Sequence, residues 1–120
     1  MAFDGVHEHP VDPERVAAAR ETALTKEASE EVARTLRLLA DPVRARVASA
    51  LAAGEEMCVG DIALAIDAGE NTVSYALGQL RAGGLVRNRR AGRFIYYQLA
   101  DPRLRDLVDL ALRVGGRTRG

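Results

Sequence analysis

The residues from 61 to 99 follow an order that few folds can accommodate. A short helical segment and a tight connection come first, and then a second helical segment in which Val73, Leu77 and Leu80 recur on one face. The stretch LVRNRRAGRFIYYQL follows, with the β-branched and aromatic residues typical of two paired strands around a turn. A helix, a second helix and a hairpin in this order predict a winged helix-turn-helix.

Charge is distributed unevenly along the chain. Between residues 71 and 100 there are five arginines and no acidic residue, although the whole chain has 17 basic and 17 acidic residues. The five are Arg81, Arg87, Arg89, Arg90 and Arg93. A single arginine is explained by solvation of the surface, but five without an acidic neighbour in sequence indicate a polyanion partner. We therefore predict that the chain binds double-stranded DNA.

Length and composition set the broad class. A chain of 120 residues is expected to form one domain and to bury part of its apolar surface between two subunits of a homodimer. Alanine, leucine and valine dominate and tryptophan is absent, so we expect a mainly α fold with a small β-hairpin wing. We find no apolar run of the roughly 20 residues that span a bilayer and no signal peptide, and we expect a cytoplasmic protein without a membrane anchor. A single cysteine excludes an intrachain disulfide.

Asp-Pro pairs at 12–13, 41–42 and 101–102 predict three helix starts, with aspartate as N-cap and proline at the first helical position. We expect helices over 13–26, 29–39, 42–53, 59–66, 70–82 and 102–114, and strands over 85–89 and 94–99 joined by a turn at Ala91-Gly92. Residues 1–11 are predicted to be a mobile N-terminal arm, and residues 12–120 the DNA-binding and dimerisation domain.

Helical spacing also predicts the core and the subunit interface. The expected core residues are Val32, Leu36, Leu39, Val43, Val47, Ala50, Leu51, Ile62, Ile66, Leu77 and Leu80. The last helix has apolar residues around too much of its circumference for a single partner, and we expect it to form the dimer interface with the first helix.

Polar residues occupy the other side of the 70–82 helix. Asn71, Thr72, Ser74, Tyr75 and Gln79 are expected to face outward, where their side chains can hydrogen-bond base edges or phosphates. Ala76 and Gly78 are small, and we expect them to let the backbone approach a groove. Arg89, Arg90 and Arg93 are expected around the hairpin tip, in contact with phosphate or the minor groove.

Candidate metal ligands lie before and within the 59–66 helix. Cys58 and Asp61 are three residues apart, a spacing that allows both to face the same side, and a thiolate with a carboxylate supplies half of a tetrahedral transition-metal site. The only histidines, His7 and His9, lie in the arm and are the natural completing ligands. One sulfur, two imidazoles and one carboxylate suit Zn²⁺ best, with Ni²⁺ or Co²⁺ possible.

Four stretches carry a resemblance to a known family: LLADPVRARVASAL, MCVGDIALAI, NTVSYALGQLRAGGLV and GRFIYYQLADP. Together they resemble the ArsR/SmtB family of metal-sensing winged-helix repressors over about 30–114, and most of all its zinc-responsive SmtB type. This resemblance implies that Cys58 and Asp61 share a metal with ligands from the arm of the other subunit.

The chain departs from the family pattern at several positions. Its arm offers His7 and His9 but no cysteine. The family's second metal site would begin at Asp101, but Arg103 and Val114 stand where its histidines are expected, so that site is predicted to be missing. Gly60 stands where cadmium and lead sensors carry another cysteine.

The predicted function is a homodimeric transcriptional repressor that binds operator DNA and is released by a transition metal, with zinc as the first choice. Several alternatives stay open at this point: a nickel or cobalt sensor, a regulator in which Cys58 senses a thiol or redox signal, a regulator without a small ligand, and a metal-binding or protein-interaction module without DNA. An enzyme with Cys58 as nucleophile and an arm histidine as base lacks an identifiable orienting group or oxyanion loop. We therefore predict that the protein is not an enzyme.

Overall fold

The computed structural model describes residues 9–115 of the chain. The chain divides into two compact units, and the boundary between them falls after Val32. The predicted division into an arm of residues 1–11 and a domain of residues 12–120 is not tested by this boundary and stays a prediction.

The first unit consists mainly of helix. Helix α1 (Pro13–Thr22) begins where predicted, because the Asp12 carboxylate accepts the backbone N–H of Arg15 at 3.1 Å, but it ends before the expected residue 26. Helix α2 (Lys26–Leu39) starts earlier than the expected residue 29, since the Thr25 hydroxyl accepts the N–H of Ala28 at 3.0 Å and caps the helix there. Helix α1 has no buried residue.

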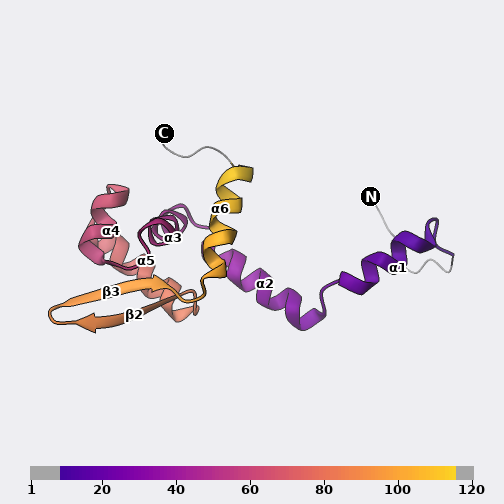
Figure 1. Ribbon diagram of the computed structural model, residues 1–120, viewed down its shortest axis with the longest axis horizontal. Helices are drawn as coiled ribbons and strands as arrows, with labels where there is room; N and C mark the ends of the chain where they lie inside the picture. The colour runs from indigo at the N-terminus through magenta and orange to yellow at the C-terminus, as the bar shows by residue number, and fades with distance from the viewer. Residues whose placement is uncertain (1–8, 116–120) are drawn as a thin grey trace. The chain divides into compact units, whose positions relative to one another are not determined.

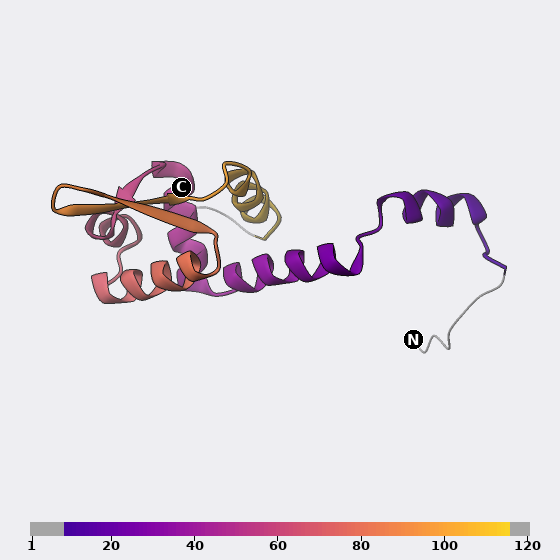
Figure 2. The same ribbon diagram turned by 90° about the horizontal axis from the view of Figure 1, so that it is seen from below.

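The second unit holds residues 33–39 of α2 and all the remaining elements, which follow the predicted order except for the added strand β1 (Figure 1). They are α3 (Pro42–Gly54), β1 (Met57–Cys58), α4 (Val59–Ile66), α5 (Glu70–Ala82), β2 (Val86–Ala91), β3 (Phe94–Leu99) and α6 (Arg103–Gly115). The predicted bounds of α4 and α5 are confirmed, and so is the mainly helical winged helix-turn-helix architecture. The turn of the β2–β3 hairpin projects beyond the helices of this unit in both views (Figures 1 and 2).

The sheet differs from the prediction in three respects. Strand β1 was not predicted; it pairs antiparallel with β3, which gives the strand order β1-β3-β2 and places Cys58 opposite Tyr96. Strand β2 extends to Ala91, so the turn consists of Gly92 and Arg93 rather than Ala91 and Gly92. Gly92 has a φ of 65°, a conformation that glycine adopts without steric cost.

Helix α6 begins one residue later than predicted, at Arg103. The Asp101 carboxylate accepts the N–H of Arg103 at 2.9 Å, and Pro102 stands outside the helix.

The core of the second unit lies among α3, α4 and α5 and the start of β2. Val73, Leu77 and Leu80 are each 0% exposed, which confirms the predicted inner face of α5. Two expected core residues are exposed, Val32 at 42% and Leu36 at 51%, and Leu39, Val43 and Ala50 are half-buried. The apolar stripe of α2 therefore stays accessible in the single chain.

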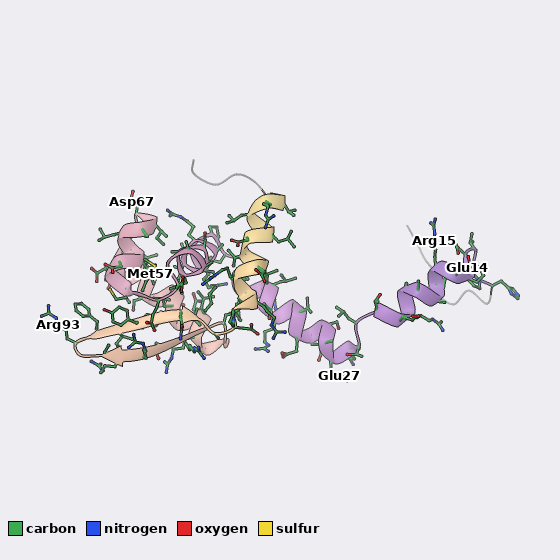
Figure 3. The ribbon with its side chains drawn as sticks, viewed as in Figure 1. Glu14, Arg15, Glu27, Met57, Asp67 and Arg93 are labelled. Carbon is green, nitrogen blue, oxygen red and sulfur yellow. The ribbon has the colours of Figure 1, made fainter. Side chains whose placement is uncertain are left out.

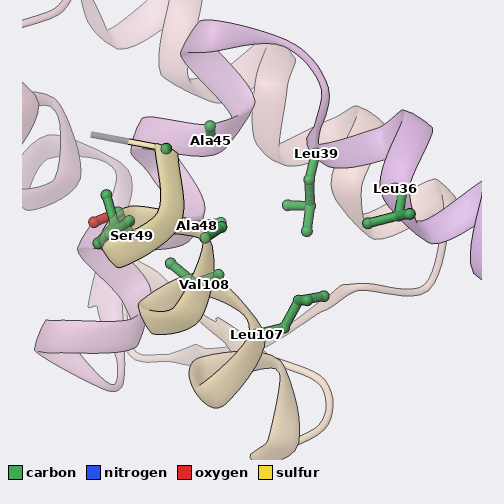
Figure 4. Close-up of a pocket in the computed structure, with 10 residues that line it drawn as sticks. Leu36, Leu39, Ala45, Ala48, Ser49, Leu107 and Val108 are labelled. Carbon is green, nitrogen blue, oxygen red and sulfur yellow. The ribbon is translucent and has the colours of Figure 1, made fainter. Parts of the chain in front are cut away.

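Helix α6 packs on α3 through Val108, which forms a second small cluster with Ala48 and Ala52. Beside it an apolar groove of about 430 Å³ opens between the C-terminal half of α2, α3 and α6 (Figure 4). Leu36 and Leu107 lie on its walls. Among residues 9–115, no helix is both long and apolar enough to cross a membrane.

Candidate nucleic-acid interface and metal site

The outer face of α5 is polar and open, as predicted. Asn71, Thr72, Ser74 and Tyr75 are all exposed, and the Tyr75 side chain has an exposed fraction of 73%. Ala76 differs from its expectation: it is 2% exposed and belongs to the core, so it does not let the backbone approach a partner.

Gln79 lies at the edge of this face and is half-buried. Its side-chain oxygen accepts a hydrogen bond from Nη1 of Arg44, on α3, at 3.0 Å. Arg44 and Gln79 line a groove of about 540 Å³ between α3 and α5, together with Asn71, Thr72 and Tyr75. The sequence-predicted polar residues of α5 therefore share one groove, except Ser74.

The tip of the hairpin carries exposed positive charge. Arg93 lies in the turn itself (Figure 3), and its guanidinium is 5.2 Å from the ring centroid of Phe94. Arg90 is also exposed, and its Nη1 donates to the Gly92 carbonyl at 3.5 Å, a long contact. Both guanidinium groups are open to an anion.

Arg89 is in a different situation. Its Nε and Nη2 donate to the two carboxylate oxygens of Glu56 at 2.7 and 2.8 Å, and its guanidinium lies 5.3 Å from the Tyr96 ring centroid. The hydrogen bonds from Arg89 hold the pKa of Glu56 below its usual value. The arginine-rich segment contains no acid of its own, but Glu56 supplies one from before β1.

Cys58 occupies the N-cap position of α4 and ends β1. It is a free, half-buried cysteine. Asp61 is exposed in the first turn of the same helix, where a carboxylate is favoured by the helix dipole. By ligand type, a thiolate and a carboxylate can supply half of a tetrahedral metal shell, and two further donors would be needed to complete it.

The predicted completing ligands lie outside this unit. His9 is exposed, and His7 lies outside the described residues. Within the part of the chain that the structure describes, no three of the His, Cys, Asp and Glu side chains are grouped so that they could hold a metal. A complete site therefore requires ligands from beyond this set, and the cross-subunit set stays a prediction.

Comparison with known proteins gives the family. A model of a helix-turn-helix domain matches residues 39–89. The transcriptional repressor SmtB homolog of Synechocystis sp. is 39% identical over 94 residues, which cover 78% of this chain and 70% of that protein. The chain belongs to the ArsR/SmtB family.

Solved structures of similar proteins agree with this assignment to the ArsR/SmtB family. The AntR antimony-specific transcriptional repressor is 27% identical with a TM-score of 0.72, over 88% of this chain and 93% of that one. The homodimeric winged helix-turn-helix domain Mb0332 from Mycobacterium bovis, described as a possible ArsR-family transcriptional regulator, is 32% identical with a TM-score of 0.65, over 78% of this chain and 89% of that one. This member of the ArsR/SmtB family is a regulator and not an enzyme, as predicted.

Proposed function

We propose that the protein is a transcriptional repressor that binds operator DNA as a homodimer through α5 and the β2–β3 hairpin. The observation that carries this proposal is the exposed polar face of α5, which stands beside a hairpin with Arg90 and Arg93 open at its tip. The polar side chains would read base edges, and the arginines would neutralise phosphates. Below, α5 is called the recognition helix and the β2–β3 hairpin the wing.

We further propose that a transition metal, with zinc as the first candidate and nickel or cobalt as alternatives, releases the DNA. Cys58 and Asp61 of one subunit would hold the ion together with His7 and His9 of the other. Similar proteins are named for metals, as the antimony-specific repressor is. The bound ion would cross-link the arm of one subunit to the helix that precedes the recognition helix of the other.

The position of Cys58 supports this coupling. Cys58 pairs with Tyr96 on β3, and the Arg89 guanidinium lies over the Tyr96 ring. A displacement of the backbone at Cys58 would therefore move β3, a strand of the wing, directly through the β1–β3 pairing. The coupling is reciprocal, so bound DNA must weaken metal binding by the same factor.

The test is a mobility-shift assay on a duplex from the protein's own promoter region, with and without Zn²⁺, Ni²⁺ or Co²⁺. Wild-type protein is expected to shift the duplex and to release it when the metal is added. Cys58→Ser is expected to bind DNA equally well and to resist release. Asp67→Asn, at the other end of α4, serves as the matched control and is expected to behave as wild type.

Two results would contradict the proposal. A protein that shifts no promoter duplex is not a repressor of that promoter. If Cys58→Ser still releases DNA normally when zinc is added, the Cys58 sulfur has no role in release. A second candidate, in which Cys58 senses a thiol oxidant, is favoured only by the free, half-buried thiol. In that case an oxidant releases DNA from wild type while the three metals do not.

A further inference from the structure

One side chain, Arg44 of α3, joins three helices of the second unit. Its Nε donates to the Leu38 carbonyl at 2.6 Å, its Nη2 to the Arg37 carbonyl at 3.4 Å, and its Nη1 to the Gln79 side-chain oxygen at 3.0 Å. Arg37 and Leu38 lie in the last turn of α2, where the Arg37 carbonyl also accepts the N–H of Ala40 at 3.2 Å. The guanidinium thus bonds the Leu38 carbonyl at the end of α2 and the Gln79 side chain of the recognition helix at the same time.

A second contact brings the same helices together. Gly83, the C-cap of the recognition helix, lies so close to Leu38 that a Cβ at this position would overlap the Leu38 side chain. The backbone N–H of Arg44 also donates to the N-cap Asp41 at 3.0 Å, which fixes the start of α3. The position of Arg44 is therefore fixed at its backbone by Asp41 and at its guanidinium by α2 and Gln79.

We propose that Arg44 is a positioning residue for DNA recognition, which sets the recognition helix against α2 and orients the Gln79 amide. A guanidinium has donors only, so the Gln79 atom that faces it must be the oxygen. The Gln79 NH₂ group is then the part left to meet DNA. This inference rests on the proposed DNA-binding function.

The consequence concerns which bases Gln79 can read. A glutamine recognises adenine by using its oxygen and its NH₂ group together. With its oxygen bonded to Arg44 and the amide plane thereby fixed, Gln79 turns its NH₂ donors outward, where they match phosphate oxygens and the acceptors of guanine or thymine. Arg44 thereby determines specificity without touching a base.

Arg44→Lys separates geometry from charge. Lysine keeps the positive charge but loses the planar fork that bonds α2 and Gln79 at once. The matched control is Arg46→Lys, on the same helix, because Arg46 donates to the Ile66 carbonyl at the end of α4 and not to the recognition helix. Thermal unfolding establishes that each variant is folded.

The measurement is fluorescence anisotropy with two duplexes of equal length, one from the protein's own promoter and one with that sequence scrambled. We expect Arg44→Lys to lose about tenfold in the ratio of the two affinities, the size of one hydrogen bond to a charged group, while its affinity for scrambled DNA stays within about twofold. Arg46→Lys is expected to keep the wild-type ratio.

A readout without DNA tests the contact itself. The Nη1 proton of Arg44 that bonds Gln79 is expected to exchange slowly in the wild-type NMR spectrum. Exchange of this proton is expected to stay slow in Gln79→Glu, whose carboxylate still accepts from Arg44, and to become faster in Gln79→Ala. Gln79→Glu is nevertheless expected to bind promoter DNA more weakly, because an acceptor replaces the donors. This variant also keeps the test decisive if Arg44→Lys does not fold.

Three results would overturn the inference. Arg44→Lys with the wild-type affinity ratio shows that the fork is not needed, and an equal loss on both duplexes with a shallower salt dependence shows a direct phosphate contact. If wild-type protein does not bind its promoter duplex, the proposed function fails together with this inference. The wild-type titration alone reveals this failure, without any variant.

Discussion

At the scale of single residues, the finding that sequence reasoning missed is the partner of Arg89. Glu56 lies 33 positions before Arg89, and the two meet because β1 pairs with β3 on the side opposite β2. A two-residue strand such as β1 has no alternating pattern that could reveal it. The segment rich in arginine was correctly identified, but one of its charges is already neutralised within the protein.

Removal of the Glu56 carboxylate is expected to free this charge for DNA. In Glu56→Gln, Arg89 loses its ion pair, and we expect tighter DNA binding with a log–log salt dependence steeper by about 0.9, the value for one added phosphate contact. Anisotropy titrations over a range of KCl concentrations measure this slope. Glu55→Gln, at the exposed neighbouring position, is the control, and an unchanged slope in Glu56→Gln would show that Arg89 never reaches phosphate.

Asp101 gives a pH-dependent prediction. Hydrogen bonds from the Arg103 side chain and backbone lower the pKa of Asp101 from 3.8 to about 2. Because the pKa is lower in the folded state, the carboxylate stabilises the fold above pH 3.8 and loses this effect as the pH falls towards about 2.

The check is the melting temperature of wild type and Asp101→Asn across this range. Asparagine can still cap α6, so the difference between the two proteins isolates the charge, and it is expected to shrink from pH 3.8 to about 2. In Arg103→Gln the pKa of folded Asp101 is expected to rise towards 3.8, so the loss is expected to be smaller and to be complete at a higher pH. A difference that is independent of pH would argue against the ion pair.

At the scale of elements, helix starts were predictable because capping is local chemistry. The carboxylates of Asp12 and Asp41 both accept backbone N–H groups three residues on, as the Asp-Pro pairs indicated. The end of α1 and the start of α2 were missed because the sequence around Thr25 carries no proline or capping box, only a hydroxyl. The polar face of α5 was predictable from its 3.6-residue period, whereas the bond between Gln79 and Arg44 depends on tertiary packing.

Two glycines near the end of the recognition helix are expected to respond oppositely to alanine. Gly84 has a φ of 82°, so Gly84→Ala is expected to lower the free energy of unfolding by about 1 kcal/mol. A Cβ at Gly78, inside the helix, meets no atom within 4 Å, and Gly78→Ala is expected to raise it by about 0.5–1 kcal/mol. Urea denaturation of both variants measures this, and the same sign for both would contradict the argument.

At the scale of the whole molecule, apolar surface remains without cover in the single chain. Leu110 and Val114 of α6 are 56% and 80% exposed. Helix α1 has no buried residue, and an isolated helix of its 10 residues is marginal in water. Both observations support the proposed homodimer. The residue contacts across its interface could not be predicted from the sequence, because they depend on how two chains pack together.

The dimer can be tested on α6. Leu110→Glu places a charge on the exposed apolar side, and we expect the dimer dissociation constant to rise at least about tenfold, as measured by light scattering after size exclusion. Leu64→Glu on α4 is the control, since Leu64 is 82% exposed but lies away from the expected interface. Equal effects of the two substitutions would place the interface elsewhere.

Because β3 is the central strand, β2 is an edge of the sheet, and three of its six residues are arginines: Arg87, Arg89 and Arg90. An uncovered edge strand invites pairing with the same strand of another molecule, and positive side chains oppose this aggregation by mutual repulsion. Arg90, which is also proposed to hold phosphate, would thus help to keep unbound repressor molecules from aggregating when no DNA is near.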